Sequence, residues 1–246
     1  MTLDYDVMAA SYARHRRIHP GVLKGLVEHG ALSGAARVLD VGCGTGNYMA
    51  ALEQAAGCEV WGLEPSEGMR AKALAQFPRA RVREGQAERL EFPEAWFDLV
   101  FSVDVIHHVA DRAAHYREAF RVLKPGGRAC TVTDSEDVIR RRVPLSSHFP
   151  ETVAVELKRY PRIADLRAMM AAAGFTGLEE ETVELQYPLR DLQSYRDQAF
   201  SSLHLIPPEA LRDGLARLER ELEEKGFVQA RSLYTLLWGT KAGAPR

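Results

Sequence analysis

The residues best suited to ligand chemistry form a glycine-rich loop that begins with an acidic side chain. The segment runs from Asp40 to Gly46 (DVGCGTG) and joins a short apolar run to a helical pattern. Glycines at this spacing allow positive φ and let a ligand approach the backbone, and the start of the next helix adds free N–H groups. The segment therefore predicts a ligand site after a first strand.

The carboxylate of Asp40 indicates which kind of ligand this loop prefers. A dinucleotide-binding loop has the spacing G-x-G-x-x-G and places a pyrophosphate on the helix N-terminus. Here the spacing is G-x-G-x-G, and Asp40 stands two residues before Gly42. A carboxylate at this position would repel a pyrophosphate and would favour a cation, such as the ammonium group of an amino acid.

Two later positions extend this interpretation. Glu64 closes the second apolar run, 22 residues after Gly42, and a carboxylate at such a strand end can hold both hydroxyls of a ribose. Gln86 and Ala87 follow the third strand, where they would border a purine ring. An adenosine with a short amino-acid tail fits the loop, Glu64 and this pair in order.

Five segments together resemble a known family. They read VLDVGCGTG, WGLEPSEGM, EGQAERLEF, FDLVFSVDVIHHV and VLKPGG. In this order they look like class I S-adenosylmethionine-dependent methyltransferases, in the UbiE/type 11-like small-molecule branch. The resemblance covers about residues 37–134. It implies an enzyme that moves a methyl group from S-adenosylmethionine to an O, N or C atom of a small molecule by in-line displacement.

The resemblance also implies where the cofactor would be held. Gly42, Gly44 and Gly46 would line the methionine tail and the ribose, with Asp40 near the ammonium group and Glu64 on the ribose hydroxyls. The other implied contacts lie along the strand ends: Pro65, Ser66 and Met69 beside ribose and adenine, Gln86 and Ala87 at the adenine edge, and Ser102 and Val103 under the cofactor.

An N-terminal segment fits the same family. Related enzymes fold a Y-x-x-x-R stretch over the cofactor, and here Tyr12 and Arg16 have that spacing. Arg16 would pair with the methionine carboxylate in the two-pronged geometry that arginine offers. Tyr12 would close the site by stacking or hydrogen bonding. A plain surface helix is the alternative for this segment.

His107 and His108 are the candidate general bases, with His108 slightly favoured. They follow the fourth strand, at the edge where ligands bind in open α/β sheets, and histidine titrates near neutral pH. Asp104 is a further candidate. A structural role for the histidine pair stays open, and a base is needed only if the nucleophile arrives protonated.

Alternating strands and helices must position these residues. The pattern along the chain predicts strands at Arg37–Val41, Glu59–Leu63, Arg81–Glu84, Phe97–Ser102, Arg128–Thr133, Thr176–Leu185 and Ser232–Gly239. Such alternation predicts a doubly wound, mostly parallel α/β sheet. The resemblance implies seven strands in the order 3-2-1-4-5-7-6, with strand 7 antiparallel and a helical substrate-lid insertion.

Three regions follow from this division. Residues 1–30 form an N-terminal helical segment over the cofactor, 31–134 a Rossmann-like core, and 135–246 the C-terminal half of the sheet, with lid insertions at about 135–160 and 186–230. Residues 135–160 show no clear period, and 188–230 read as mostly helical. The residues that could line an acceptor pocket are His148, Tyr160, Tyr195, His204, Trp238 and the segment 192–205.

Composition limits the classes of partner. The formal net charge is −2, without the basic surplus of a nucleic-acid binder. We expect the basic cluster Arg140–Arg142 on a solvated surface, with a phosphate contact as the alternative. Three cysteines without a CxxC motif predict a reducing compartment and no metal site. We expect a cytoplasmic monomer or homodimer with a small-molecule acceptor, acting on neither nucleic acid nor membrane. A catalytically silent cofactor-binding protein and a nicotinamide oxidoreductase are the alternatives.

Overall fold

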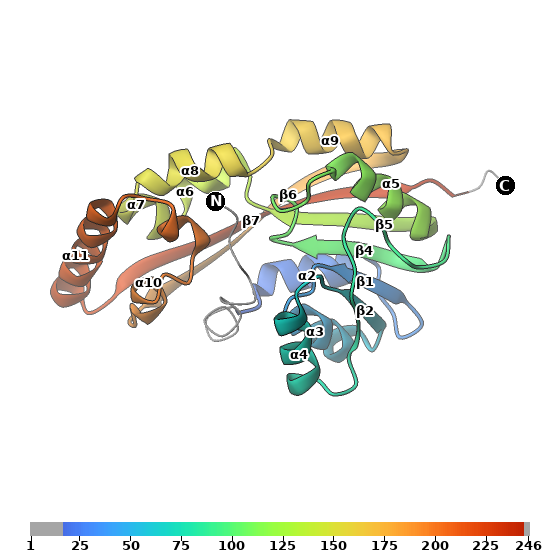
Figure 1. Ribbon diagram of the computed structural model, residues 1–246, viewed down its shortest axis with the longest axis horizontal. Helices are drawn as coiled ribbons and strands as arrows, with labels where there is room; N and C mark the ends of the chain where they lie inside the picture. The colour runs from blue at the N-terminus through green and yellow to red at the C-terminus, as the bar shows by residue number, and fades with distance from the viewer. Residues whose placement is uncertain (1–16, 244–246) are drawn as a thin grey trace.

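A seven-stranded sheet forms the centre of the computed structural model, which describes residues 17–243 (Figure 1). The strand order is β3-β2-β1-β4-β5-β7-β6. The first five strands pair in parallel, and β7 is antiparallel to both β5 and β6. The strands are β1 Arg37–Val41, β2 Glu59–Leu63, β3 Arg81–Arg83, β4 Phe97–Val103, β5 Leu123–Thr133, β6 Phe175–Leu189 and β7 Val228–Lys241. The predicted fold class, strand order and direction of strand 7 are confirmed.

Helices enclose this sheet on both faces. The helices are α2 Pro20–His29, α3 Asn47–Ala56, α4 Glu67–Gln76, α5 Arg112–Val122, α6 Glu136–Arg141, α7 Leu145–His148, α8 Glu151–Arg159, α9 Ile163–Ala172, α10 Gln193–Arg196, the 3-10 helix η1 Ser201–His204 and α11 Pro208–Lys225. One buried cluster joins α2 and α3 to the sheet, and another joins α5 and α9 to it. Burial on both faces explains why the central strands β1 and β4 are mostly apolar.

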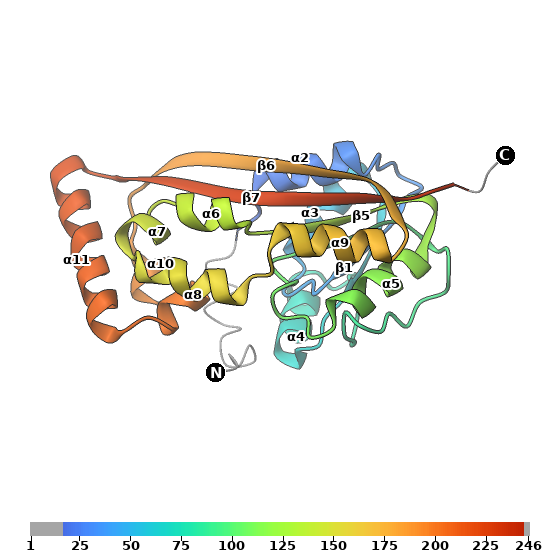
Figure 2. The ribbon, with the colours of Figure 1, turned by 90° about the horizontal axis from the view of Figure 1, so that it is seen from above.

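The strands β6 and β7 continue well past their neighbour β5. Pairing of β5 with β7 ends at Thr133 and Thr235, whereas pairing of β6 with β7 runs on to Leu189 and Val228. We call the overhanging part, residues 183–189 with 228–234, the arm; α10, η1 and α11 follow from its end (Figure 2). A third buried cluster gathers there from α7, residues 192–210, α11 and the start of β7. The arm region therefore has a core of its own.

The structure departs from the sequence expectations mainly in this half. Residues 135–160, which show no period, form α6, α7 and α8, helices of 6, 4 and 9 residues. Helices this short complete too few turns for a hydrophobic repeat to stand out. Strand β6 extends to Leu189 rather than Leu185, because cross-strand pairing with β7 holds it extended although most of its side chains are exposed.

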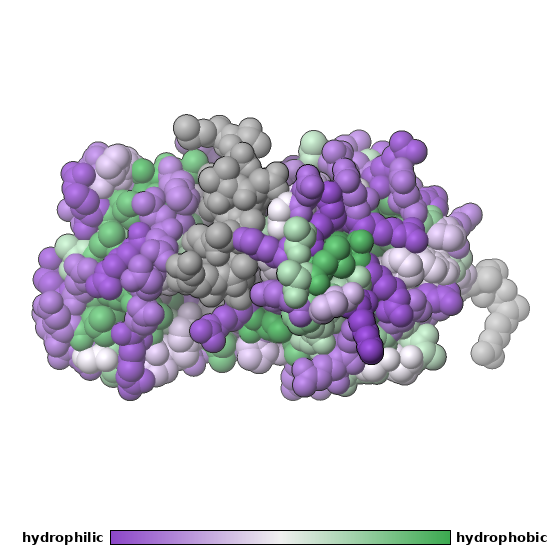
Figure 3. Space-filling view, turned by 60° about the horizontal axis from the view of Figure 1, so that its bottom comes forward, coloured by the Kyte–Doolittle hydropathy of each residue, from purple (hydrophilic) through white to green (hydrophobic). Residues whose placement is uncertain are grey.

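The described surface is mostly polar. Figure 3 shows one face, with hydrophilic residues over most of it and apolar residues in small patches. Large exposed apolar side chains within residues 17–243 are Leu74, Leu185 and Tyr187. No helix in this range combines the length and the apolar character that crossing a bilayer requires.

Gly214 allows α11 to pack directly against α7. A methyl group at this position would overlap the ring of Phe149, which is fully buried. Alanine normally favours a helix over glycine by about 1 kcal/mol, but here Gly214→Ala should lower the free energy of unfolding by about 1–3 kcal/mol, as overpacking does. Urea denaturation measures this. Glu223→Ala, at an exposed position of the same helix, should leave it almost unchanged, and equal effects of the two would contradict the packing argument.

Candidate functional site

A cavity of about 610 Å³ lies at the carboxyl edge of the sheet. One end is formed by the glycine loop and by the residues that follow β2, and the other end by the arm, α8 and η1. The carboxyl edge is where open α/β sheets bind their ligands. The predicted loop therefore opens onto a space large enough for a small molecule.

The glycine loop has a left-handed backbone at three positions. Gly42, Gly44 and Gly46 have φ angles of 73°, 55° and 79°, a region that glycine occupies without steric cost. A side chain at Gly42 would also overlap Val105. The Gly42 and Cys43 N–H groups donate to the Leu63 carbonyl at 2.7 and 3.1 Å, which fixes the loop to β2. Gly42 and Gly44 line the cavity, and Gly46 caps the N-terminus of α3.

Glu64 lies at the end of β2 with its carboxylate held in place. Its Oε2 accepts a hydrogen bond from the Gly44 N–H and its Oε1 from the Ser66 N–H, each at 2.9 Å. The residue is buried and lines the cavity. A carboxylate oxygen can accept more than one hydrogen bond, and ligand hydroxyls are donors that suit it. The chemistry of this group fits a ribose.

Asp40 lines a smaller recess of about 50 Å³ beside the main cavity. Burial, and after it the nearby charge of Glu64, raise the pKa of Asp40 well above its ordinary value. A buried carboxylate of this kind gains from a cationic partner. Arg17 lines the same recess. The recess thus offers one group of each charge, which fits the ammonium and carboxylate of an amino acid.

Arg17 was missed at the sequence level, although it adjoins the predicted Arg16. Its spacing from Tyr12 does not match the Y-x-x-x-R pattern, so only its place beside Asp40 identifies it. The two residues predicted to cover the cofactor, Tyr12 and Arg16, lie outside the described residues.

The other predicted cofactor contacts divide into two groups. Pro65, Ser66, Met69 and Val103 line the cavity, and the Ser66 hydroxyl accepts from the Met69 N–H at 3.1 Å, which caps α4.

The other three predicted cofactor contacts, Gln86, Ala87 and Ser102, lie outside the cavity wall. Gln86 is exposed, and its carbonyl accepts from the Arg89 N–H. The Ala87 carbonyl lies 3.2 Å from His115 Nδ1. Ser102 is buried within β4.

The residues after β4 also face the cavity. His107, His108 and Asp104 all line it. The ring of His107 stacks on Tyr160, with centroids 4.1 Å apart. Asp104 has a left-handed backbone, with φ of 57°, and its Oδ2 accepts from the Tyr234 hydroxyl at 3.0 Å. A non-glycine residue held in this region is strained, and such strain concentrates at ligand sites.

The arm end of the cavity contains a buried ion-pair cluster that overturns one expectation. Arg142, expected on a solvated surface, has a side chain only 12% exposed. It pairs with Asp134 at 2.6 Å and with Glu156. The reason is tertiary: Asp134 follows β5 and Glu156 lies on α8, and the fold brings both carboxylates to the same arginine.

The predicted pocket residues are only partly at the cavity. Tyr160 and Tyr195 line it, as do Ala199, Phe200, Ser201 and Leu205 of the segment 192–205. His148 pairs with Glu221 on α11 instead, with Nε2 and Oε2 2.8 Å apart. His204 is exposed outside the wall. Trp238 is fully buried in the core, with the Arg128 guanidinium over its ring, because its strand lies between β5 and β6.

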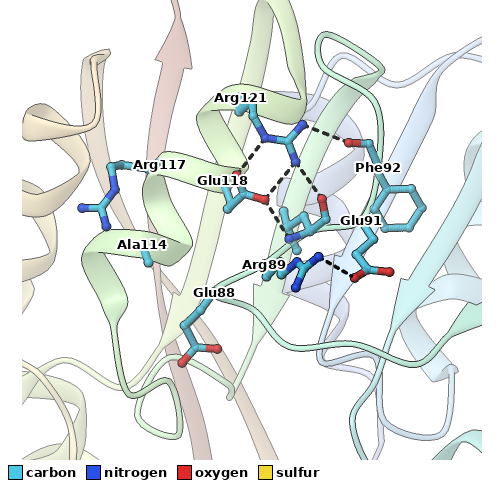
Figure 4. A pocket seen from close by; sticks show the side chains of 9 residues that line it. Glu88, Arg89, Glu91, Phe92, Ala114, Arg117, Glu118 and Arg121 are labelled. Atoms are coloured by element: carbon cyan, nitrogen blue, oxygen red, sulfur yellow. Dashed lines mark hydrogen bonds and ion pairs between the residues drawn. The ribbon is translucent and has the colours of Figure 1, made fainter.

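A second hollow, of about 590 Å³, lies over α5 and residues 88–92 (Figure 4). Its central polar groups are satisfied by one another. Arg121 donates to Glu118 and to the carbonyls of Leu90 and Phe92, and Glu118 accepts from the Leu90 N–H. This network ties the loop to the helix, so the hollow has a structural explanation.

Known proteins resemble this chain in sequence over its N-terminal half. Residues 39–131 match the family model described as a methyltransferase domain. The chain is 32% identical over 151 residues to the 2-methyl-6-phytyl-1,4-hydroquinone methyltransferase of Synechocystis, covering 59% of this chain and 47% of that protein. It is 32% identical over 128 residues to the demethylmenaquinone methyltransferase of Lysinibacillus sphaericus, covering 50% and 55% respectively. The chain spans about half the length of the curated relatives it matches.

Solved structures share the fold over nearly the whole chain. The YcgJ protein of Bacillus subtilis matches with a TM-score of 0.65 and 20% identity, over 92% of this chain and 100% of that one. Phosphoethanolamine N-methyltransferase 2 of Haemonchus contortus, solved with S-adenosyl-L-methionine, matches with a TM-score of 0.62 and 20% identity, over 96% and 57%. Residues 39–131 therefore resemble the methyltransferase domain in sequence, and the chain shares its fold with solved methyltransferase structures.

Proposed function

We propose that this protein transfers a methyl group from S-adenosylmethionine to an O, N or C atom of a small molecule bound at the arm end of the cavity. The observation that carries the proposal is the Glu64 carboxylate, oriented by two backbone N–H groups beside the Asp40 recess. Glu64 lines the main cavity and Asp40 the adjacent recess, and Gly42 and Gly44 form part of the wall of both. The cavity extends from these groups to the arm, which leaves space for an acceptor and favours an enzyme over a silent binding protein.

The residues present would hold the cofactor by charge and by hydrogen bonds. Glu64 would accept from the ribose hydroxyls, Asp40 would face the ammonium group, and Arg17 or Arg16 would pair with the carboxylate. When bound, S-adenosylmethionine supplies an electrophilic methyl group on a sulfonium. The other proposed cofactor contacts that line the cavity are Gly42, Gly44, Pro65, Ser66, Met69 and Val103. The family resemblance adds Tyr12, Gly46, Gln86, Ala87 and Ser102.

The chain's contribution to the reaction is mainly positioning. Holding two reactants in line can lower a barrier by roughly 7–11 kcal/mol, and the arm and α8 cover the acceptor end of the cavity. Where the acceptor carries a proton, His107, His108 or Asp104 would accept it, because all three line the cavity after β4. The Tyr234 hydroxyl fixes the carboxylate of Asp104.

Replacing Glu64 tests the ribose assignment. In Glu64→Ala the charged acceptor is lost, and a hydrogen bond to a charged group contributes about 1.5–3 kcal/mol, so affinity for S-adenosylhomocysteine should fall about tenfold or more. Calorimetry measures this. Glu67→Ala, which removes the same charge from an exposed position three residues later, is the control and should bind normally. If Glu64→Ala binds as tightly as this control, the ribose assignment is wrong.

Asp40 should make the stability of the ligand-free protein depend on pH. Its folded pKa lies above the ordinary 3.8, so between these values the folded state binds more protons than the unfolded state. The contribution of Asp40 to the free energy of unfolding is therefore highest below about pH 3.8. This contribution decreases as pH rises through the folded pKa of Asp40. Asp40→Asn should remove that decrease, so its stability relative to wild type should increase with pH.

Urea denaturation at a series of pH values measures this effect. Asp213→Asn, at an exposed aspartate on α11, is the control and should keep the wild-type pH dependence. A pH profile for Asp40→Asn parallel to the wild-type profile would show that Asp40 is not buried in an unfavourable charged form.

A further inference from the structure

Three arginines face the arm end of the cavity, and they differ in how their charges are balanced. Arg142, Arg159 and Arg231 all line it. The guanidinium of Arg142 is matched by the carboxylates of Asp134 and Glu156. Within residues 17–243, no carboxylate lies within ion-pair distance of Arg159 or Arg231. Two arginines therefore line a shared space without an acidic partner from the described chain.

Both arginines are held in place by the fold. Arg231 lies on the arm, and its backbone exchanges two hydrogen bonds with Val143, at 2.7 and 3.3 Å. Arg159 ends α8, and its guanidinium donates to the Ser201 hydroxyl of η1 at 3.1 Å. The two cations thus come from different elements that converge on one cavity. Neither is a long side chain extended freely into solvent, because both residues are only partly exposed.

The balance of charge at this end favours an anion. The charged residues here are three arginines and two acids, which leaves one positive charge in excess: Arg142, Arg159 and Arg231 against Asp134 and Glu156. The two carboxylates of this group are already bonded to Arg142, so they are poorly placed to receive a cationic acceptor. A guanidinium matches a carboxylate or phosphate in a two-pronged hydrogen-bond geometry.

The rest of this wall is apolar or aromatic. Its side chains include Leu145, Tyr160, Tyr195, Phe200, Leu205 and Leu233. Aromatic side chains bury large areas and favour contact with flat rings. The wall therefore suits a molecule with an apolar or aromatic body as well as a charged end.

We propose that the methyl acceptor is a small organic anion, whose carboxylate or phosphate group is held by Arg159 and Arg231 and whose apolar or aromatic body lies against the tyrosine-rich wall. This inference rests on the proposed methyl transfer and names the class of acceptor for the same cavity. It distinguishes this chain from relatives named for hydroquinone, menaquinone and sterol methylation.

A matched set of ring probes tests the charge preference. Benzoate, phenyl phosphate, benzamide and benzylamine are titrated into the full chain saturated with S-adenosylhomocysteine, with ligand-observed NMR as the measurement. At least one of the two anions should bind at least tenfold more tightly than benzamide and benzylamine. The tighter of the two identifies the anionic group as carboxylate or phosphate.

Arginine variants test the site of binding. Arg159→Gln and Arg231→Gln should each weaken binding of the better anion about tenfold or more, the size expected when a hydrogen bond to a charged group is lost. Arg212→Gln, at an exposed position on α11 outside the cavity wall, is the matched control and should bind it normally. Circular dichroism and the affinity for S-adenosylhomocysteine are measured for every variant, so that a misfolded variant is recognised.

Several results would overturn the inference. These are no binding of either anion at millimolar concentration, equal binding of benzamide or benzylamine, or an equal loss in Arg212→Gln. If the wild-type chain binds neither S-adenosylmethionine nor S-adenosylhomocysteine, the proposed function fails instead. The two failures are therefore distinguishable.

Discussion

The site depends on one buried carboxylate that joins two segments of backbone. Glu64 accepts a hydrogen bond from Gly44 in the glycine loop and another from Ser66 at the start of α4. The loop itself is fixed to the end of β2 by the carbonyl of Leu63. A charge this deeply buried is stable only when hydrogen bonds satisfy it. The same bonds that solvate Glu64 therefore set the shape of the cofactor end of the cavity.

The second constraint is that β6 and β7 are longer than the sheet they complete. Because β7 pairs with β5 only as far as Thr235, the rest of the hairpin extends past the sheet and carries α10, η1 and α11. These helices pack with α7 around Phe149 and Leu218 in a separate core. The arm end of the cavity therefore adjoins a packed core, which can hold side chains in fixed positions near the sheet edge.

The two ends of the cavity differ in charge. Carboxylates of Asp40 and Glu64 stand at the cofactor end, whereas Arg159 and Arg231 stand at the arm end without acidic partners among residues 17–243. Between them, Asp104 and the two histidines follow β4. In the proposed reaction, a cationic cofactor and an anionic acceptor would each meet complementary charge, and the reacting atoms would lie between the two.

The sequence by itself determined the alternating fold, the strand order through its family resemblance, and the left-handed glycine loop with Asp40 and Glu64. These features are local: a glycine at positive φ or an acid at a strand end is legible within a few residues. The short helices of 135–160, the buried pairing of Arg142 and the position of Arg17 were decided only by tertiary structure. Asp134, Glu156 and Arg231 come from separate segments of the sequence, and only the folded chain brings them to one cavity.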